Sequence, residues 1–238
     1  MMRFLSLFAG IGGMDLGLER AGMECVGQVE IDPYCRRVLA KHWPNVWRHD
    51  DVMTFDPTTS PAFDAIAAGF PCQDVSNAGK RAGISAPRSG LYREVVRCLR
   101  VARPRVAVLE NVAALLARGM GTVLGDLAAI GYDAEWDCVP ACSVGAPHCR
   151  DRVFIVADAQ RREQQREEPR CWETRRVGRF IQPVPWDRPW QTALAEIRGM
   201  GNGLPRSVER TDALRNAVVP QVAEYVGRVV MGTMKEAP

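Results

Sequence analysis

Short runs of consecutive apolar residues alternate along this chain with longer segments in which apolar residues recur every three or four positions. The short runs predict strands that are buried on both faces, at residues 3–8, 25–29, 45–47, 63–68, 104–109 and 150–157. The longer segments predict helices at residues 14–21, 33–42, 91–101 and 221–231, and one or two helices over residues 113–130. Because strands alternate with helices, the expected fold class is α/β, with a mostly parallel sheet covered on both faces.

A glycine-rich turn, residues 9–13, joins the first expected strand to the first expected helix. Glycines in such a turn let backbone N–H groups approach a ligand, and the start of the helix adds a partial positive charge. Glu30 ends the second strand about 20 residues beyond the glycines, the separation typical of an acid that binds ribose hydroxyls. Asp51, followed by the apolar Val52, is a candidate acceptor for an adenine amino group. A helix-capping Glu30 and a turn aspartate at Asp51 are the alternatives.

A single cysteine follows the strand expected at residues 63–68. Gly69 and Pro71 stop the apolar run, so Cys72 is held in a turn at the carboxyl end of a parallel strand. Open α/β sheets bind their ligands at this edge, and a fixed, partly exposed thiol there is a candidate nucleophile. A buried structural cysteine is the alternative.

Further charged residues stand at the ends of later strands. Glu110 ends the strand at residues 104–109. Arg150 and Arg152 open the strand at residues 150–157, and their spacing of two directs both side chains to one face. Glu110 is therefore another acid at the ligand-binding edge of the sheet.

Two segments without helix or strand periodicity are rich in positive charge. The first, residues 77–90, contains Lys80, Arg81 and Arg88, which suit contact with phosphate, and loops of this length within a compact domain are usually functional. The second begins at residue 158 and interleaves arginines with glutamates and tryptophans. It has the composition of a small segment that reads nucleic acid, with a solvated insertion as the alternative.

Composition limits the kind of protein this is. The chain has 238 residues, 47% hydrophobic and 25% charged, with a formal net charge of +3, so it can bury one sizeable core with a small appendage. No apolar stretch reaches the roughly 18 residues of a membrane span, and the N-terminus leads into a strand, so a cytoplasmic location without membrane contact is expected. Cys138, Cys142, His148 and Cys149 lack the paired spacing of zinc ligands, and no metal is expected.

Together these residues resemble the DNA cytosine-5 methyltransferase family, over most of residues 3–157 and again over residues 199–230. The matching pieces stand in the family's order at residues 8–13, 30, 51–52, 69–73, 89–91, 110–112, 150–153 and 216–218. The resemblance implies a Rossmann-like, S-adenosylmethionine-dependent methyltransferase fold. It also implies a catalytic domain formed by residues 1–157 and 215–238, with a small irregular target-recognition region at residues 158–214.

The resemblance implies roles for individual residues. The S-adenosylmethionine site would be lined by Phe8, Ala9, Gly10, Ile11, Gly12, Gly13, Glu30, Ile31, Asp51, Val52, Pro71, Leu91, Asn216 and Val218. Cys72 would add to C6 of a flipped-out cytosine, Glu110 would hold or protonate N3, and Arg152 with Arg150 would donate to O2. Contacts to double-stranded DNA would come from Gln73, Ser76, Lys80, Arg81, Arg88, Arg161 and Arg162.

The sequence also departs from the family pattern. His148 and Cys149 stand where the family commonly has Gln-Arg. The region at residues 158–214 is short for a target-recognition domain, as expected of a phage or prophage member, and its sequence readout is slight or needs a second protomer. Arg215 stands where the family usually has glycine before Asn216, which leaves open a carboxylated S-adenosylmethionine as donor.

The resemblance therefore predicts a DNA cytosine C5 methyltransferase. The alternatives are the same chemistry with the carboxylated donor, an RNA cytosine methyltransferase, and a catalytically silent DNA-binding subunit. The presence of both Cys72 and Glu110 argues against the silent subunit. A restriction endonuclease as partner is left open.

Overall fold

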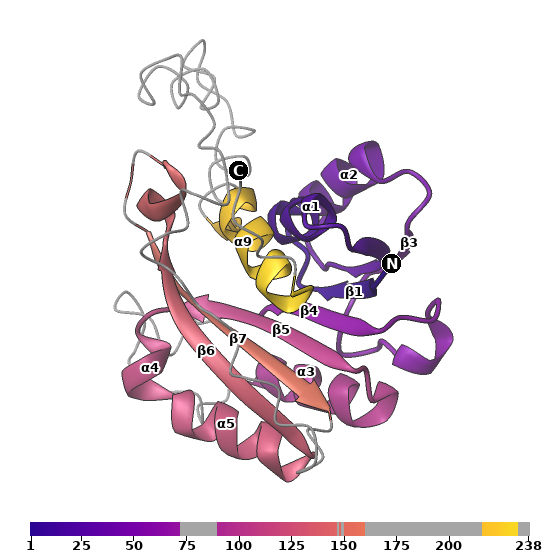
Figure 1. Ribbon diagram of the computed structural model, residues 1–238. Helices are drawn as coiled ribbons and strands as arrows, with labels where there is room; N and C mark the ends of the chain where they lie inside the picture. The colour runs from indigo at the N-terminus through magenta and orange to yellow at the C-terminus, as the bar shows by residue number, and fades with distance from the viewer. Residues whose placement is uncertain (72–89, 147, 149, 160–215, 233–238) are drawn as a thin grey trace.

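Strands form one sheet in the order β3-β2-β1-β4-β5-β7-β6 (Figure 1). The computed structural model describes residues 1–71, 90–146, 148, 150–159 and 216–232. The strands are β1 (Arg3–Leu7), β2 (Glu24–Val29), β3 (Trp47–His49), β4 (Ala65–Gly69), β5 (Val106–Val112), β6 (Tyr132–Pro140) and β7 (Asp151–Ala159).

The first five strands of the chain are parallel to one another. Strand β7 lies between β5 and β6 and is antiparallel to both. The short connection between β6 and β7 allows this antiparallel pairing, whereas parallel neighbours need longer crossovers. The predicted mostly parallel α/β sheet is confirmed.

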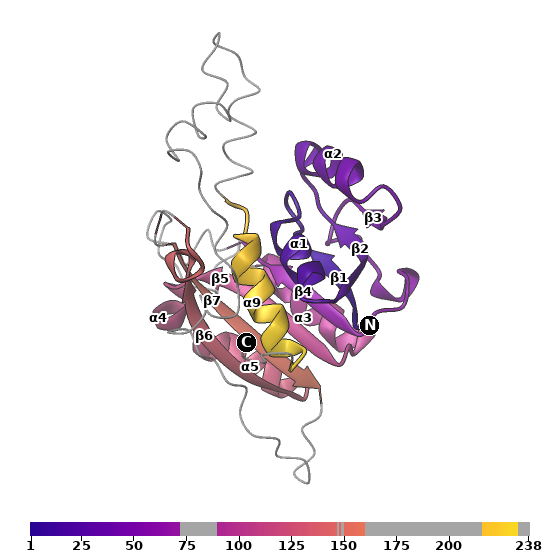
Figure 2. The same ribbon diagram turned by 45° about the horizontal axis from the view of Figure 1, so that its top comes forward.

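Helices cover both faces of the sheet (Figures 1 and 2). They are α1 (Gly13–Arg20), α2 (Pro33–His42), α3 (Gly90–Ala102), α4 (Leu115–Arg118), α5 (Met120–Ala129) and α9 (Pro220–Val230), with short 3-10 helices η1 (Pro57–Thr59) and η3 (Ala141–Val144). Buried residues of α3, α4 and α5 pack with Leu5 and Leu109, and those of α1 and α9 pack with Phe4 and Val108. Phe4 and Leu5 face opposite layers because successive side chains alternate along a strand.

The C-terminal helix returns to the start of the chain. Helix α9 lies beside α1 in both views (Figures 1 and 2), and its buried residues join the same cluster as Met14 and Leu18 of α1. The last helix therefore packs in the same core as the first. This packing fixes residues 216–219, which precede α9, near the turn that precedes α1.

The observed elements differ in detail from those expected. Of the one or two helices expected over residues 113–130, the structure has two, because Gly119 separates α4 from α5. Strand β7 continues to Ala159, so it extends past residue 157, the expected limit of the first catalytic segment. Within the described ranges, no helix is long and apolar enough to cross a membrane.

Candidate active site

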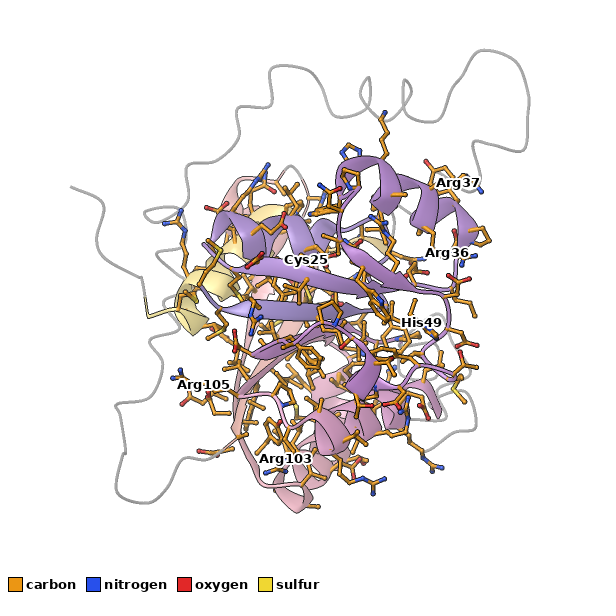
Figure 3. The ribbon with its side chains drawn as sticks, turned by 90° about the vertical axis from the view of Figure 1, so that its right-hand side faces the viewer. Cys25, Arg36, Arg37, His49, Arg103 and Arg105 are labelled. Atoms are coloured by element: carbon orange, nitrogen blue, oxygen red, sulfur yellow. The ribbon has the colours of Figure 1, made fainter. Side chains whose placement is uncertain are left out.

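A cavity of about 500 Å³ opens at the carboxyl edge of the parallel strands. In Figure 3 this edge is on the right, where His49 ends β3, whereas Arg105 precedes β5 at the opposite edge. Of the predicted site residues, those that line the cavity are Phe8, Ala9, Gly10, Gly13, Glu30, Pro71, Glu110, Arg150, Arg152, Asn216 and Val218. The sheet therefore brings distant segments of the sequence around one space, as expected at the ligand-binding edge of an open α/β sheet.

The turn after β1 is shaped by left-handed backbone conformations. The φ angle is 56° at Phe8, 57° at Gly10 and 83° at Gly12. For a phenylalanine this conformation costs about 1–2 kcal/mol. The Ala9 N–H donates to the Val29 carbonyl at 3.2 Å, and the Gly12 N–H donates to the Ala9 carbonyl at 2.9 Å. These bonds hold the strained turn, and backbone strain of this kind clusters at ligand sites.

Gly13 permits the cavity to close from its C-terminal side. A Cβ atom at this position would lie 2.3 Å from the carbonyl oxygen of Val218. Any side chain would therefore push residues 216–218 away from the start of α1. The glycine explains how a segment from the end of the chain reaches a turn near its beginning.

Glu30 is anchored by the backbone on both sides of the cavity mouth. One carboxylate oxygen accepts from the Gly10 N–H at 2.7 Å, and the other accepts from the Asp32 N–H at 2.8 Å. Each oxygen retains a further lone pair for a ligand hydroxyl. Glu30 thus ties the glycine turn to the start of α2 and borders the cavity, a geometry compatible with its predicted contact with ribose.

The remaining predicted cofactor residues that the structure describes do not line this cavity. Ile11 and Gly12 belong to the glycine turn, and the Ile31 side chain is 66% exposed. An oxygen of Asp51 accepts from the Met53 N–H at 2.9 Å, the bond of a turn aspartate. Val52 is buried in the core, and Leu91 packs against that core from the first turn of α3.

Glu110 and Arg152 form an ion pair across two strands. Arg152 Nε lies 2.9 Å from a Glu110 oxygen. Pairing of β5 with β7 places Val112 opposite Arg152, so Arg152 and Glu110 are diagonal neighbours on one face. Gly69 stands beside Glu110 on β4, and a Cβ atom there would lie 3.2 Å from the other Glu110 oxygen. The glycine leaves the acid room at the cavity wall.

Burial and arginines act in opposite directions on Glu110. The residue is 8% exposed, and burial raises the pKa of its carboxyl above the ordinary value. Arg152 and Arg150 oppose this shift because their positive charges favour the carboxylate. A carboxyl group with a raised pKa holds a proton more readily than an exposed carboxyl group, and from the cavity wall it can pass that proton to a ligand.

Comparison with known proteins shows which family has this arrangement. Residues 2–198 match the family of C-5 cytosine-specific DNA methylases. The chain belongs to this family. The Type II methyltransferase M.HgiCII of Herpetosiphon aurantiacus is 36% identical over 166 residues, which are 67% of this chain and 38% of the relative. M2.BsuMI of Bacillus subtilis (strain 168) is also 36% identical, over 66% of this chain and 42% of the relative. The chain thus spans less than half the length of these relatives.

Solved structures with a similar fold are also methyltransferases. The Entamoeba histolytica methyltransferase EhMeth matches with a TM-score of 0.70 at 14% identity, over 99% of both chains. The S. pombe Dnmt2 methyltransferase matches with a TM-score of 0.65 at 15% identity, over 99% of this chain and 100% of that one. This similarity confirms the Rossmann-like methyltransferase fold that the family resemblance implied.

Sequence reasoning did not assign a site role to Asn111, which lines the cavity beside Glu110. Its side-chain nitrogen donates to the Phe70 carbonyl at 3.1 Å, and its oxygen accepts from the Val112 N–H at 2.8 Å. Phe70 comes two residues before Cys72, so this buried amide connects the cysteine segment to the strand that carries Glu110. Asn111 directly follows Glu110 in residues 110–112, one of the segments that match the family, and this position could have identified it as a site residue.

Other cavity residues were also missed: Ser6, Leu7, Met14, Asp32, Cys35, Gly69, Phe70, Val112 and Ala217. Ser6 and Met14 belong to apolar periodic segments, where sequence alone does not separate core from cavity wall. Asp32 and Cys35 flank the start of α2, and the Asp32 side chain accepts from the Cys35 N–H at 2.9 Å. This helix cap gives Asp32 a structural reason to be there.

Several predicted site residues lie outside the described residues: Cys72, Gln73, Ser76, Lys80, Arg81, Arg88, Arg161, Arg162 and Arg215. The predicted target-recognition region lies outside them as well, apart from residues 158 and 159. Among the residues that the structure does describe, no group of three or more His, Cys, Asp or Glu side chains could hold a metal ion.

Proposed function

We propose that this chain transfers a methyl group from S-adenosylmethionine to C5 of cytosine in double-stranded DNA, through a covalent bond between Cys72 and C6 of a flipped-out base. The observation that carries the proposal is the meeting of two half-sites in one cavity. The glycine turn with Glu30 suits a nucleoside, and the Glu110–Arg152 pair suits a base. Family membership supports the same chemistry.

The cavity fits the donor by size and by chemistry. Its volume of about 500 Å³ lies within the usual range for ligand pockets. Glu30 at its mouth offers carboxylate lone pairs to the ribose hydroxyls, while Phe8 and Pro71 supply apolar walls. Residues 216–218 would cover the donor from the C-terminal side. When bound, the donor supplies a methyl group on a sulfonium, which leaves as a neutral thioether after transfer.

The chain's residues would prepare the cytosine for this transfer. C5 is a weak nucleophile until the Cys72 thiolate adds to C6, which breaks the C5–C6 double bond and makes C5 electron-rich. Glu110 would hold a proton at N3 while charge develops on the ring, and the two arginines would donate to O2. After the methyl group has bonded to C5, a base removes the C5 proton and the Cys72–C6 bond breaks, which restores the double bond.

This chemistry requires a base outside the helix, which enzymes that act on bases achieve by extrusion from the stack. We assign binding of the duplex to Gln73, Ser76, Lys80, Arg81, Arg88, Arg161 and Arg162, with the segment at 158–214 as the recognition region. Arg215 is the one residue that suggests a carboxylated donor, and the test below distinguishes the two donors.

The test is bisulfite sequencing of DNA from cells that express the chain, with mass analysis of the modified base. We expect 5-methylcytosine in a defined context, and a covalent complex between purified protein and duplex DNA that contains 5-fluorocytosine, since fluorine cannot leave as a proton. Cys72→Ser should form no complex. Unmodified cytosines would contradict the activity, and methylation without the covalent complex would contradict the Cys72 mechanism. A carboxymethyl group on cytosine would show that the donor is the carboxylated S-adenosylmethionine.

A further inference from the structure

A buried carboxylate lies beneath the cavity, on the first turn of α1. The Asp15 side chain is completely buried, with 0% exposure. One of its oxygens accepts from the Ser6 hydroxyl at 2.6 Å, and the other accepts from the Gln28 side-chain nitrogen at 2.8 Å. The Cys25 sulfur lies 4.0 Å from this second oxygen, and Figure 3 shows Cys25 inside the ribbon. Neutral groups from β1 and β2 thus surround a group that can carry a full negative charge.

The geometry determines which way the Ser6 hydroxyl points. A separation of 2.6 Å is typical of a charge-assisted bond from a hydroxyl to an ionised carboxylate. Ser6 also lines the cavity. Since a hydroxyl has one hydrogen and two lone pairs, a Ser6 hydrogen committed to Asp15 leaves only lone pairs for a ligand.

Gln28 is held in the orientation that this arrangement needs. Its side-chain oxygen accepts from Arg48 Nε at 3.2 Å, so its nitrogen is turned toward Asp15. Arg48 in turn donates to the carbonyls of Leu39 and Trp43 at the end of α2. The orientation of Asp15 is thus supported by two strands beyond its own helix.

We infer that Asp15 is a positioning residue for the methyl donor. Because Asp15 accepts a hydrogen bond from the Ser6 hydroxyl, Ser6 presents its lone pairs to the cavity. The buried negative charge of Asp15 also favours a cationic group on the ligand. The inference rests on the proposed function, in which the donor carries a sulfonium and an ammonium group. An anion in a low-dielectric interior acts on a nearby cation more strongly than it would in water.

Protonation of Asp15 would reverse the arrangement. A neutral carboxyl group would donate its own hydrogen to Ser6, and the Ser6 hydrogen would then turn toward the cavity, where it repels a cation. Burial raises the pKa of Asp15 to about 6, so the reversal falls within an accessible pH range. Because a bound cation favours the ionised form, we expect donor binding at pH 6 to release protons and to tighten as the pH rises through 6.

Other charged groups around Asp15 are few in the described residues. Glu19 lies on the same helix and raises the Asp15 pKa slightly, after burial. Cys25 faces it from β2, and Arg48 of β3 reaches it only through Gln28. On α9, which packs against α1, Glu224 is paired with Arg228 at 2.8 Å.

The experiment is calorimetric titration of the full chain between pH 5 and pH 7 with two ligands. S-adenosylmethionine carries both cationic groups, whereas 5′-methylthioadenosine keeps the nucleoside and sulfur but carries neither. For the wild type we expect the dissociation constant of S-adenosylmethionine to fall by at most about tenfold per pH unit, with no such change for methylthioadenosine. At pH 6 the heat of binding should depend on the ionisation enthalpy of the buffer only for S-adenosylmethionine.

Two variants complete the test. Asp15→Asn should remove the pH dependence and weaken S-adenosylmethionine binding at pH 7 by roughly tenfold, within the usual range of coupling between sites. Glu19→Gln removes a carboxylate that lies on the same helix but does not bond Ser6. This variant should keep the pH dependence, with its midpoint moved only slightly to lower pH. A wild-type profile that is flat, or that methylthioadenosine shares, would overturn the inference. If Asp15→Asn does not fold, proton release on binding to the wild type decides the question. A wild type that binds S-adenosylmethionine at no pH would contradict the proposed function itself.

Discussion

Glu110 and Asp15 are both buried acids near the cavity, but their partners differ. Glu110 is paired with Arg152 at 2.9 Å, whereas Asp15 has the neutral donors Ser6 and Gln28. Burial raises the pKa of both carboxyl groups, and arginines oppose the shift at Glu110 but not at Asp15. The first acid is therefore suited to exchange a proton with a ligand at the cavity wall, and the second to impose a charge from beneath it.

Replacement of Glu110 tests its role in proton transfer. Glu110→Gln keeps the size of the side chain but cannot deliver a proton, so the rate of methyl transfer in a single turnover should fall by roughly 10²–10⁴-fold. Asp151→Asn makes the same charge change on an exposed neighbour of Arg152 and should leave the rate unchanged. An undiminished rate in Glu110→Gln would remove Glu110 from the mechanism.

The buried charge of Asp15 should cost stability above pH 6. Its pKa is about 6 in the folded chain against 3.8 for the ordinary group, so the folded state binds the proton more tightly. The free energy of unfolding therefore loses a contribution of about 3 kcal/mol as the pH rises from about 3 to about 7, at 1.36 kcal/mol per pKa unit. Urea unfolding of wild type and Asp15→Asn across this range should show a difference that changes with pH. Parallel curves would mean that Asp15 has an ordinary pKa.

The contact between helices α1 and α9 leaves no room for an added side chain at Gly17. Gly17 lies in the middle of α1, and a Cβ atom there would be 2.3 Å from the Pro220 carbonyl oxygen and 2.5 Å from the Ala223 Cβ. These are atoms of a helix that cannot move without moving residues 216–218 at the cavity. The contact therefore couples the C-terminal helix to the shape of the site.

Alanine at Gly17 should destabilise the fold although alanine usually favours helices. We expect Gly17→Ala to lower the free energy of unfolding by about 1–3 kcal/mol, the usual cost of overpacking. Gly125→Ala is the matched control, because no atom of the described residues beyond the backbone of α5 itself lies within 4 Å of a Cβ at that position. This control should stabilise the chain by roughly 0.5–1 kcal/mol. Equal effects of the two substitutions in urea unfolding would contradict the tight contact.

For the whole molecule, the proposed contact with DNA depends on arginines outside the described residues. Lysine is rare in this chain, and most of the 31 cationic residues are arginines. Phosphate contacts give affinity and positioning, whereas base contacts give specificity. The short region at residues 158–214 contains arginines, which suit phosphate contacts, and tryptophans, which are candidates for contacts with bases.

The salt dependence of DNA binding tests this assignment. Replacement of Arg161, Arg162, Arg166 and Arg170 by glutamine should weaken binding and flatten the plot of log affinity against log salt by up to about 0.9 per lost phosphate contact. Binding would be measured by fluorescence anisotropy on one duplex at several salt concentrations. An unchanged slope would indicate a solvated insertion. Weaker binding with no change in the sequence that is methylated would indicate that these arginines contact the DNA phosphates and not the bases.

Much of the fold was predictable because its strands are short and buried on both faces, so that apolar runs mark them clearly. The carboxyl edge was predictable as well, since parallel strands that carry Glu30 and Glu110 near their carboxyl ends must bring those acids to one side of the sheet. The sequence left open one or two helices over residues 113–130, because helical spacing continues across Gly119. Asn111 was missed as a site residue because its role depends on a hydrogen bond to the Phe70 carbonyl, and Phe70 is remote in sequence.

The sequence by itself determined the alternation of strand and helix, the glycine turn and the order of the family motifs, because these depend on local patterns and spacing. Only the tertiary structure decided that Arg152 pairs with Glu110 through antiparallel β5 and β7, and that Gly13 admits Val218. It also decided that Asp15, an ordinary polar position in a helical pattern, lies fully buried beneath Ser6. Burial and long-range pairing depend on how elements pack, and a pattern read along one chain does not contain that information.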